Sequence, residues 1–418
     1  MQKKKKATSD IPYPNTLLIP QYRTDEILHS LIEKRGLNIE YNKEIVNYTQ
    51  SKDIVSATLS SGETVHCKYL VGADGGSSTV RKLSGINFIG ETNEEDRMII
   101  VDGIINGLKR NRWHIWPKTK GKQVAACPLP NSNQFQVMIR INPNEKVNLN
   151  ETMLSQRFKE LTEFELTNIT WSSIFRPNVR LAEKYRKGRV FIAGDAAHVH
   201  TPAGAQGLNT GIQDAYNLGW KLSQSIKEGD EKLLDSYESE RQPIAARVLK
   251  KSNELYSEIE NQNISGLKRG DEERQLSISY YGGPLANASN EQTKTLKSGD
   301  RAPDAIYNSA HNKKRLFELY QGSHFTFLAF GETSSQTILQ LKDRFDKDMM
   351  KMFVVGANTS KKGYINDFIG NIQNNYGISE YTLILIRPDG YIGAIITSDF
   401  QEKFEKVLNI FEITYNQL

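Results

Sequence analysis

Residues 188–214 read GRVFIAGDAAHVHTPAGAQGLNTGIQD, and this stretch decides how the rest of the chain is interpreted. It opens with four apolar residues, 190–193, which are typical of a buried strand and run directly into Gly194 and Asp195. A loop rich in proline and glycine comes next, and an amphipathic helical pattern begins near Asn209. The order predicts a strand, a tight turn that carries one carboxylate, and a glycine-rich loop that opens a helix.

The predicted turn and helix start present two kinds of hydrogen-bonding group. A carboxylate at the carboxyl end of a strand, here Asp195, can accept hydrogen bonds from sugar or ribityl hydroxyls. The backbone amides of Gly207, Leu208 and Asn209 stand at a predicted helix N-terminus, where they can hold a developing negative charge. The stretch therefore predicts a ligand site at one end of a strand.

A second segment, residues 69–86, reads YLVGADGGSSTVRKLSGI and repeats the strand–turn–helix order. Its short apolar strand runs into Asp74, and Ser77 and Ser78 are placed to cap a helix that carries Arg81. A single strand–turn–helix is a common pattern in α/β proteins. Its position upstream of residues 188–214, and its complete form, make it more specific here.

Together the two segments resemble the DG and GD motifs of FAD-dependent aromatic-ring hydroxylases, the group A flavoprotein monooxygenases. The match over residues 188–214 is long and ungapped. The resemblance implies FAD as cofactor, NADH or NADPH as co-substrate, and hydroxylation of a small phenol-like aromatic substrate with O2. Because the flavin performs the chemistry, no catalytic side chain is expected.

The resemblance also assigns roles to residues around the flavin. Asp195 would hold the ribityl–pyrophosphate side, Gly207–Asn209 would face the flavin pyrimidine, and Pro202 would shape the loop near the reacting carbon. Asp74 and Arg81 would order the cofactor crevice. The full cofactor-binding set is Gln21, Asp74, Gly75, Arg81, Gly194, Asp195, Pro202, Gly207, Leu208 and Asn209.

The chain departs from the family pattern before residue 69. The family opens with a strand, a GxGxxG loop and a helix, and this fingerprint does not occur upstream of the DG motif here. Residues 20–36 instead resemble the segment after the fingerprint: a Pro20–Gln21 pair and a helix that starts at Thr24 and stops at Gly36. We therefore expect an incomplete FAD domain, truncated at its N-terminus, and weak FAD binding, or none, by these 418 residues.

The expected fold class is α/β, mixed with α+β features. An incomplete Rossmann-like domain that binds FAD and NAD(P) would cover residues 1–90 and 184–290, with an antiparallel substrate-binding sheet inserted over 91–183 and a thioredoxin-like domain over 296–418. Short alternating runs predict the inserted sheet. Its expected strands lie near 98–103, 112–116, 123–128 and 135–141, with a helix near 151–161.

Two long helices are expected after the GD motif, over 208–222 and 233–255, the second interrupted at Pro243. Glu240 and Arg241 point in different directions on a helix, which favours structural ion pairs with neighbours over an acid–base pair. The apolar face expected for the first helix comprises Ile212, Ala215, Leu218, Gly219 and Leu222.

Strands and helices alternate after residue 296, with strands over 324–331, 351–357 and 381–396 and helices near 335–347 and 364–375. Residues 387–390, RPDG, predict a hairpin within the last stretch. This region resembles the thioredoxin-like domain of phenol-hydroxylase-type members. It contains no cysteine, which excludes a thiol redox role, and the resemblance implies an assembly role in a homodimer.

Composition limits the remaining possibilities. The net charge of +5 owes much to Lys3–Lys6, a solvated end, so neither nucleic acid nor a membrane is an expected partner. Cys67 and Cys127 have no ligand spacing and indicate core positions in the reducing cytoplasm. His198 and His200 lack further ligands at recognisable spacing, so no metal is expected.

Two other functions fit the same residues. A related flavoenzyme can use this frame for halogenation or epoxidation, and an inactive remnant can keep the fold without holding FAD. Bound flavin in the purified protein separates the enzymes from the remnant. Phenol-stimulated NAD(P)H oxidation separates a hydroxylase from the other enzymes.

Overall fold

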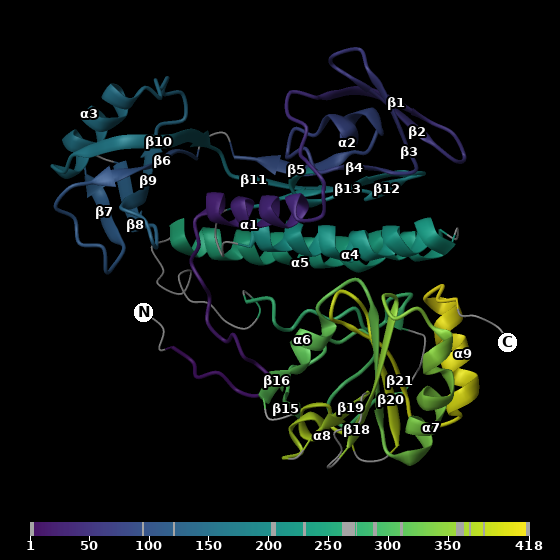
Figure 1. Ribbon diagram of the computed structural model, residues 1–418. Coiled ribbons are helices and arrows are strands. Elements are labelled where there is room, and N and C mark those ends of the chain that lie inside the picture. The colour runs from purple at the N-terminus through teal and green to yellow at the C-terminus, as the bar shows by residue number, and fades with distance from the viewer. Residues whose placement is uncertain are drawn as a thin grey trace.

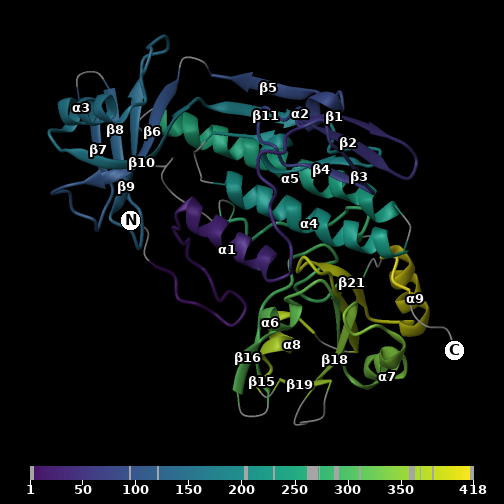
Figure 2. The same ribbon diagram turned by 45° about the horizontal axis from the view of Figure 1, so that its top comes forward.

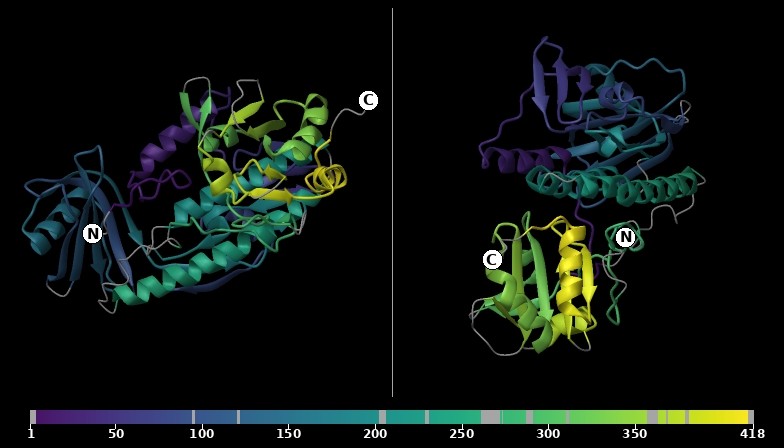
Figure 3. Two further views of the ribbon diagram at one scale, coloured as in Figure 1. Left: turned by 90° about the horizontal axis from the view of Figure 1, so that it is seen from below. Right: turned by 90° about the vertical axis from the view of Figure 1, so that its right-hand side faces the viewer.

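The long helices α4 (Gly207–Glu228) and α5 (Lys232–Glu260) lie alongside each other through the middle of the molecule (Figures 1 and 2). Smaller sheets lie on one side of this pair and a larger sheet lies on the other, as the second panel of Figure 3 shows. The computed structural model describes residues 4–93, 96–119, 122–201, 206–228, 231–260, 272, 274–286, 291–309, 312–356, 363–367, 369–378 and 381–414.

A three-stranded sheet carries both sequence motifs. β13 (Val190–Ile192) pairs in parallel with β4 (Leu70–Gly72) and antiparallel with β12 (Arg186–Lys187). All three residues of β13 are fully buried, as its uninterrupted apolar run predicts. Because the carboxyl ends of parallel strands meet at one edge, the turns after β4 and β13 lie side by side.

Two further small sheets flank this one. β1 (Ile45–Gln50), β2 (Val55–Leu59) and β3 (Thr64–Cys67) form an antiparallel meander. β11 (Asn178–Ala182) pairs with β5 (Phe88–Thr92) and with β14 (His198–Val199). A shared core joins these sheets to α4 and α5 through Val55, Val80, Val190, Phe191, Leu218, Leu234 and Tyr237.

The inserted region forms an antiparallel five-stranded sheet. Its order is β10 (Leu166–Phe175), β6 (Arg97–Ile105), β9 (Gln134–Ile141), β8 (Lys122–Pro128) and β7 (His114–Thr119). Helix α3 (Glu151–Thr162) packs against it, and Trp116 contacts Phe158 of that helix while Trp113 stays half exposed. The strands and the helix expected here are confirmed, and Cys127 is a buried core residue while Cys67 is only partly buried.

Helix α1 (Gln21–Glu33) starts three residues earlier than Thr24, directly after the extended Pro20, and no side chain caps it. The expected start at Thr24 was wrong. The helix begins immediately after Pro20, whose ring fixes its φ, and Thr24 therefore already lies inside the helix. Gly36, at φ +73°, ends the final turn as expected. No residue of α1 is buried.

The interruption expected at Pro243 is also wrong, because α5 continues through it. Proline removes one backbone hydrogen bond, but tertiary contacts on both sides hold the helical turns in place. Glu240 and Arg241 before it, and Ile244 and Ala245 after it, are all buried.

The face of α4 that is buried differs from the expected one. Ile212 is 42% exposed, and Leu218 is the one fully buried residue of the five expected. The buried positions are instead mostly polar: Thr210, Asp214, Asn217, Lys221, Gln224 and Ser225. Partners on α5 and beyond satisfy the charged members of this face, which periodicity of apolar residues does not reveal.

The C-terminal part forms a seven-stranded sheet. Its order is β16 (Asn312–Arg315), β15 (Ile306–Ser309), β19 (Tyr364–Asn366), β18 (Met350–Gly356), β17 (Phe325–Phe330), β20 (Thr382–Ile386) and β21 (Ile392–Ile396). Its helices are α6 (Leu316–Tyr320), α7 (Glu332–Leu341), α8 (Asn371–Asn375) and α9 (Phe400–Ile410). The expected hairpin of β20 and β21 is confirmed.

The helix expected over 364–375 is largely wrong. Residues 364–366 form β19, which pairs in parallel with β18 and buries Ile365. A left-handed Gly370, φ +67°, then precedes the short helix α8. The part of the chain that the structure describes holds no helix whose length and apolar character would let it span a membrane.

Candidate functional site

The turn after β4 is organised by Asp74. Its carboxylate accepts hydrogen bonds from Ser78 Oγ at 2.5 Å and from the Val80 amide at 3.1 Å. Ser78 Oγ in turn accepts from the Arg81 amide at 2.9 Å and caps α2 (Thr79–Leu83), as expected. Gly75 adopts φ +79°, which lets the chain turn between Asp74 and the helix. Both Asp74 oxygens therefore act within their own turn.

Arg81 joins the two motif turns. Its Nη1 donates to the carbonyl of Ala196 at 2.8 Å and its Nη2 to the carbonyl of Gly76 at 2.9 Å. The guanidinium lies 3.8 Å from the centre of the Phe88 ring and is almost fully buried. Burial lowers the pKa of Arg81, and the charge of Asp74 opposes that shift. The structure thus brings the DG and GD segments together through this side chain.

Asp195 lies in η1 (Gly194–Ala196), the turn after β13, and is exposed. No described residue forms a hydrogen bond or ion pair with its carboxylate. Gly194 adopts φ +60°, and a Cβ added to Gly211 of α4 would lie 3.2 Å from Gly194 Cα. This close approach sets the start of α4 directly against the turn and leaves the Asp195 carboxylate available to a ligand.

Asp214 of α4 is the residue that sequence reasoning missed. Its Oδ2 accepts from the Gly194 amide at 3.2 Å and from His198 Nε2 at 2.6 Å, and its Oδ1 accepts from Arg241 Nε at 2.7 Å. Burial alone would raise the pKa of Asp214, but the hydrogen bond from His198 and the charge of Arg241 lower it. The available signal was its spacing of four residues from Thr210, which places both on one helix face.

The start of α4 supplies the amides that the sequence predicted. The backbone amide of Thr210 donates to the carbonyl of Gln206 at 2.9 Å and makes the first hydrogen bond of the helix. Gly207 and Leu208 come before it, so their amides have no acceptor within the helix. Leu208 is half exposed, and Asn209 is also exposed. Pro202, assigned to the loop before this helix, lies outside the described residues.

His200 adds an unused acceptor beside the helix start. A Cβ on Gly207 would lie 3.2 Å from its Cε1, and its Nδ1 donates to the carbonyl of Thr201 at 3.1 Å. Its Nε2 is buried and has no hydrogen-bond partner among the residues that the structure describes. Burial lowers the pKa of His200 and keeps the ring neutral, so Nε2 is an acceptor.

These groups fit a flavin. Asp195 and His200 Nε2 can accept hydrogen bonds from hydroxyl or N–H groups, and the amides of Gly207 and Leu208 can donate to flavin oxygens. Gln21 is not brought to them: it is exposed at the first residue of α1, and no hydrogen bond joins it to these turns within the described ranges. Among described residues, no group of three or more His, Cys, Asp or Glu side chains is arranged to hold a metal.

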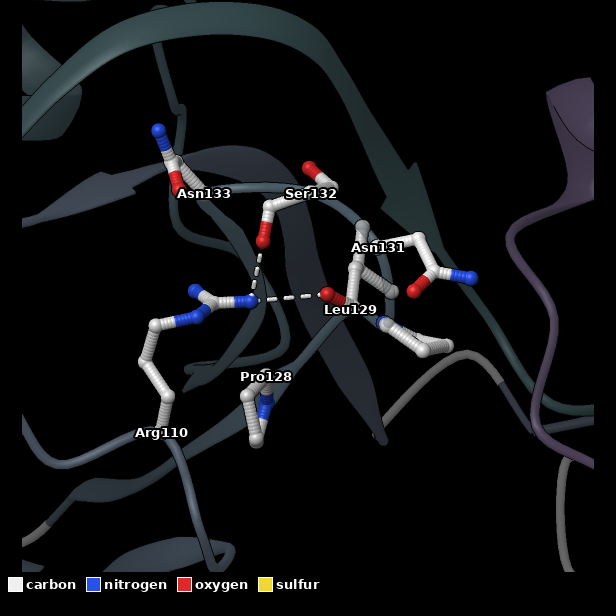
Figure 4. A pocket seen from close by; sticks show the side chains of 7 residues that line it. Arg110, Pro128, Leu129, Asn131, Ser132 and Asn133 are labelled. Atoms are coloured by element: carbon white, nitrogen blue, oxygen red, sulfur yellow. Dashed lines mark hydrogen bonds between the residues drawn. The ribbon is translucent and has the colours of Figure 1, made fainter.

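A surface hollow of about 610 Å³ lies elsewhere, at the turn between β8 and β9 (Figure 4). Arg110 donates there to the carbonyl of Leu129 at 2.7 Å, to that of Ser132 and to that of Gln134. The guanidinium stabilises the turn, and the hollow contains no residue of the two motifs.

The fold, together with the site at the carboxyl ends of β4 and β13, is that of an FAD-binding α/β protein. The family model described as "FAD binding domain" matches residues 2–252, more than half of the chain, and the chain belongs to that family. A flavin-dependent monooxygenase of Mycobacteroides abscessus is 38% identical over 397 residues, which cover 93% of this chain and 77% of that protein. Pentachlorophenol 4-monooxygenase of Sphingobium chlorophenolicum is 30% identical, with 91% and 76% covered.

Solved structures agree. OxyS anhydrotetracycline hydroxylase from Streptomyces rimosus is 28% identical with a TM-score of 0.73, and the match covers 98% of this chain and 82% of that one. The flavin-dependent monooxygenase PieE, in complex with FAD and substrate, has a TM-score of 0.77 at 20% identity, over 95% and 80% of the two chains, and shows the shared fold. The protein is an FAD-dependent monooxygenase of the aromatic hydroxylase group, as its two motifs indicated.

Proposed function

We propose that this monooxygenase holds FAD at the edge formed by β4 and β13 and hydroxylates a small phenol-like substrate with NADH or NADPH and O2. The observation that carries the proposal is the exposed Asp195 carboxylate beside the start of α4, which forms no hydrogen bond or ion pair with a described residue. FAD, when bound, supplies electron transfer from the nicotinamide and the activation of O2.

The side chains then bind and orient. With FAD bound, Asp195 would accept a hydrogen bond from a ribityl hydroxyl, and the amides of Gly207–Asn209 would donate to the pyrimidine part of the flavin. Arg81 links the two turns, and Asp74 orders the turn that precedes the helix carrying Arg81. His200 Nε2 would accept a hydrogen bond from the flavin or from the substrate hydroxyl. The role assigned to Pro202 from the sequence stays a prediction, since the residue lies outside the described ranges.

The remaining regions have proposed roles of their own. Residues 91–183 form the substrate-binding domain, between the FAD-domain parts 1–90 and 184–290. Residues 296–418 form a thioredoxin-like domain that supports a homodimer. Two unpaired cysteines support a location in the reducing cytoplasm.

The proposal is tested by incubating the protein with FAD, NADH or NADPH and a panel of phenols, and monitoring both oxidation of the nicotinamide and the products by mass spectrometry. We expect phenol-stimulated oxidation and a product heavier by one oxygen atom, labelled when the gas is 18O2. Bound flavin with no oxygenated product from any phenol would favour halogenation or epoxidation of another substrate, and flavin that does not bind at all would favour the inactive remnant.

A further inference from the structure

A cluster of buried charges joins the β20–β21 hairpin to both long helices. Its members are Lys221 of α4, Glu240 of α5, and Arg387 and Asp389 of the hairpin turn, and none of their side chains is more than 3% exposed. Charged side chains are rarely buried in this way unless they are paired. We call these four residues the hairpin cluster.

Each charged group of the hairpin cluster is hydrogen-bonded to a group of opposite charge within the cluster. Arg387 Nη1 and Nη2 donate to the two oxygens of Glu240 at 2.7 and 2.9 Å, and Lys221 Nζ donates to Glu240 Oε2 at 2.7 Å. Arg387 Nη2 also donates to Asp389 Oδ2 at 2.6 Å. Such a bidentate pair fixes orientation as well as distance.

The β20–β21 hairpin also contacts α4 directly. Asp389 Oδ2 accepts from Trp220 Nε1 at 3.0 Å and from Asn217 Nδ2 at 3.2 Å. The Arg387 guanidinium lies 5.2 Å from the centre of the Trp220 ring. These contacts hold one turn of α4 against the seven-stranded sheet.

Contacts continue from the hairpin cluster to the GD turn. The centre of the Tyr280 ring lies 5.1 Å from the Arg387 guanidinium, and the Tyr280 hydroxyl accepts from Arg241 Nη1 at 3.0 Å. Arg241 donates to Asp214, which holds the Gly194 amide. A chain of buried contacts therefore runs from the C-terminal sheet to the residue before Asp195.

We propose that Arg387 is a positioning residue for the flavin site. It fixes the position of α4 through its contact with Trp220 and through Glu240, which also pairs with Lys221. Helix α4 carries both the helix-start amides and Asp214. The C-terminal sheet thereby contributes to cofactor binding without touching the cofactor. This inference rests on the proposed flavin site at the edge of β4 and β13.

The test compares Arg387→Met with Arg315→Met. Arg315 also pairs with a fully buried carboxylate, Asp304, but on the part of the sheet near β16, away from α4. FAD affinity is measured by titration of flavin fluorescence, with circular dichroism and a thermal melt of each variant. We expect Arg387→Met to raise the FAD Kd about tenfold and Arg315→Met to leave it within about twofold, although both lower Tm. Arg387→Lys should recover part of the affinity because it keeps the charge.

Asp389→Asn is the second variant if Arg387→Met does not fold, since it keeps the shape and removes only one charge. It should raise the FAD Kd in the same direction by a smaller factor. Unchanged Kd in Asp389→Asn, Arg387→Met and Arg387→Lys, with only lower Tm, would reduce the hairpin cluster to a structural role. If Asp195→Asn raises Kd while these variants do not, the inference alone fails. If Asp195→Asn has no effect either, the proposed flavin site fails.

Discussion

At the scale of single residues, the two carboxylates of residues 188–214, Asp195 and Asp214, have different surroundings. Asp214 holds the Gly194 amide, His198 and Arg241, and Asp195 is left without a partner among the described residues. Sequence patterns could identify Asp195 because it comes after a buried strand and a glycine. They could not identify Asp214, since its partner Arg241 comes from another helix.

Asp214→Asn should be strongly destabilising. The substitution keeps the shape but leaves the Arg241 charge buried and without its ion pair, which should cost roughly 3 kcal/mol of unfolding free energy. Urea denaturation measures this loss, and exposed Asp53→Asn should change the unfolding free energy by less than about 0.5 kcal/mol. Equal unfolding free energies for the two variants would show that the buried pair contributes nothing.

At the scale of elements, local chemistry predicted strands well and helix faces poorly. The strand of 190–193, the inserted sheet and the RPDG hairpin could be predicted from apolar runs and turn residues close together in sequence. The polar buried face of α4 could not be predicted, because Lys221 pairs with Glu240 of α5, and Glu240 also pairs with Arg387, far along the chain. The continuity of α5 at Pro243 likewise depends on tertiary contacts.

The charges around Glu240 give α5 a predicted acid sensitivity. Burial alone would raise the pKa of Glu240, but Arg387 and Lys221 lower it from 4.5 to about 2. The folded carboxyl has the lower pKa, so its stabilisation is present above pH 4.5 and is lost as pH falls towards 2.

The loss should be on the order of 3 kcal/mol of unfolding free energy, measured by denaturation across that pH range. Glu240→Gln should flatten this part of the pH profile, and Glu160→Gln on the exposed face of α3 should not. A profile for Glu240→Gln as steep as that of the parent would contradict the assignment.

At the scale of the whole molecule, the long helices connect the edge of β4 and β13, where we propose the flavin site, to the C-terminal sheet. Trp220 and Leu233 of these helices pack in one core with Phe325 and Phe411. The seven-stranded sheet nevertheless has an apolar layer of its own on its other face, formed by residues such as Leu328, Ile365 and Ile384. We therefore expect residues 296–418 to fold without the helices, at reduced stability.

Expressed alone, residues 296–418 should unfold in one cooperative thermal transition with a lower Tm than the same sheet in the whole chain. Arg387 loses Glu240 in the fragment, so Arg387→Met should lower the fragment's Tm less than it lowers that of the whole chain. A disordered circular dichroism spectrum would reject this unit and its boundary at residue 296.

The proposed flavin site rests above all on the Asp195 carboxylate at the end of β13, which forms no hydrogen bond or ion pair with a described residue. The direct measurement is the FAD Kd of the parent chain, Asp195→Asn and Asp53→Asn, by fluorescence titration under one set of conditions. Loss of a hydrogen bond to a charged acceptor predicts a Kd about tenfold to a hundredfold higher for Asp195→Asn, with Asp53→Asn unchanged. Equal Kd values for the parent and Asp195→Asn would contradict a flavin-binding role for this carboxylate.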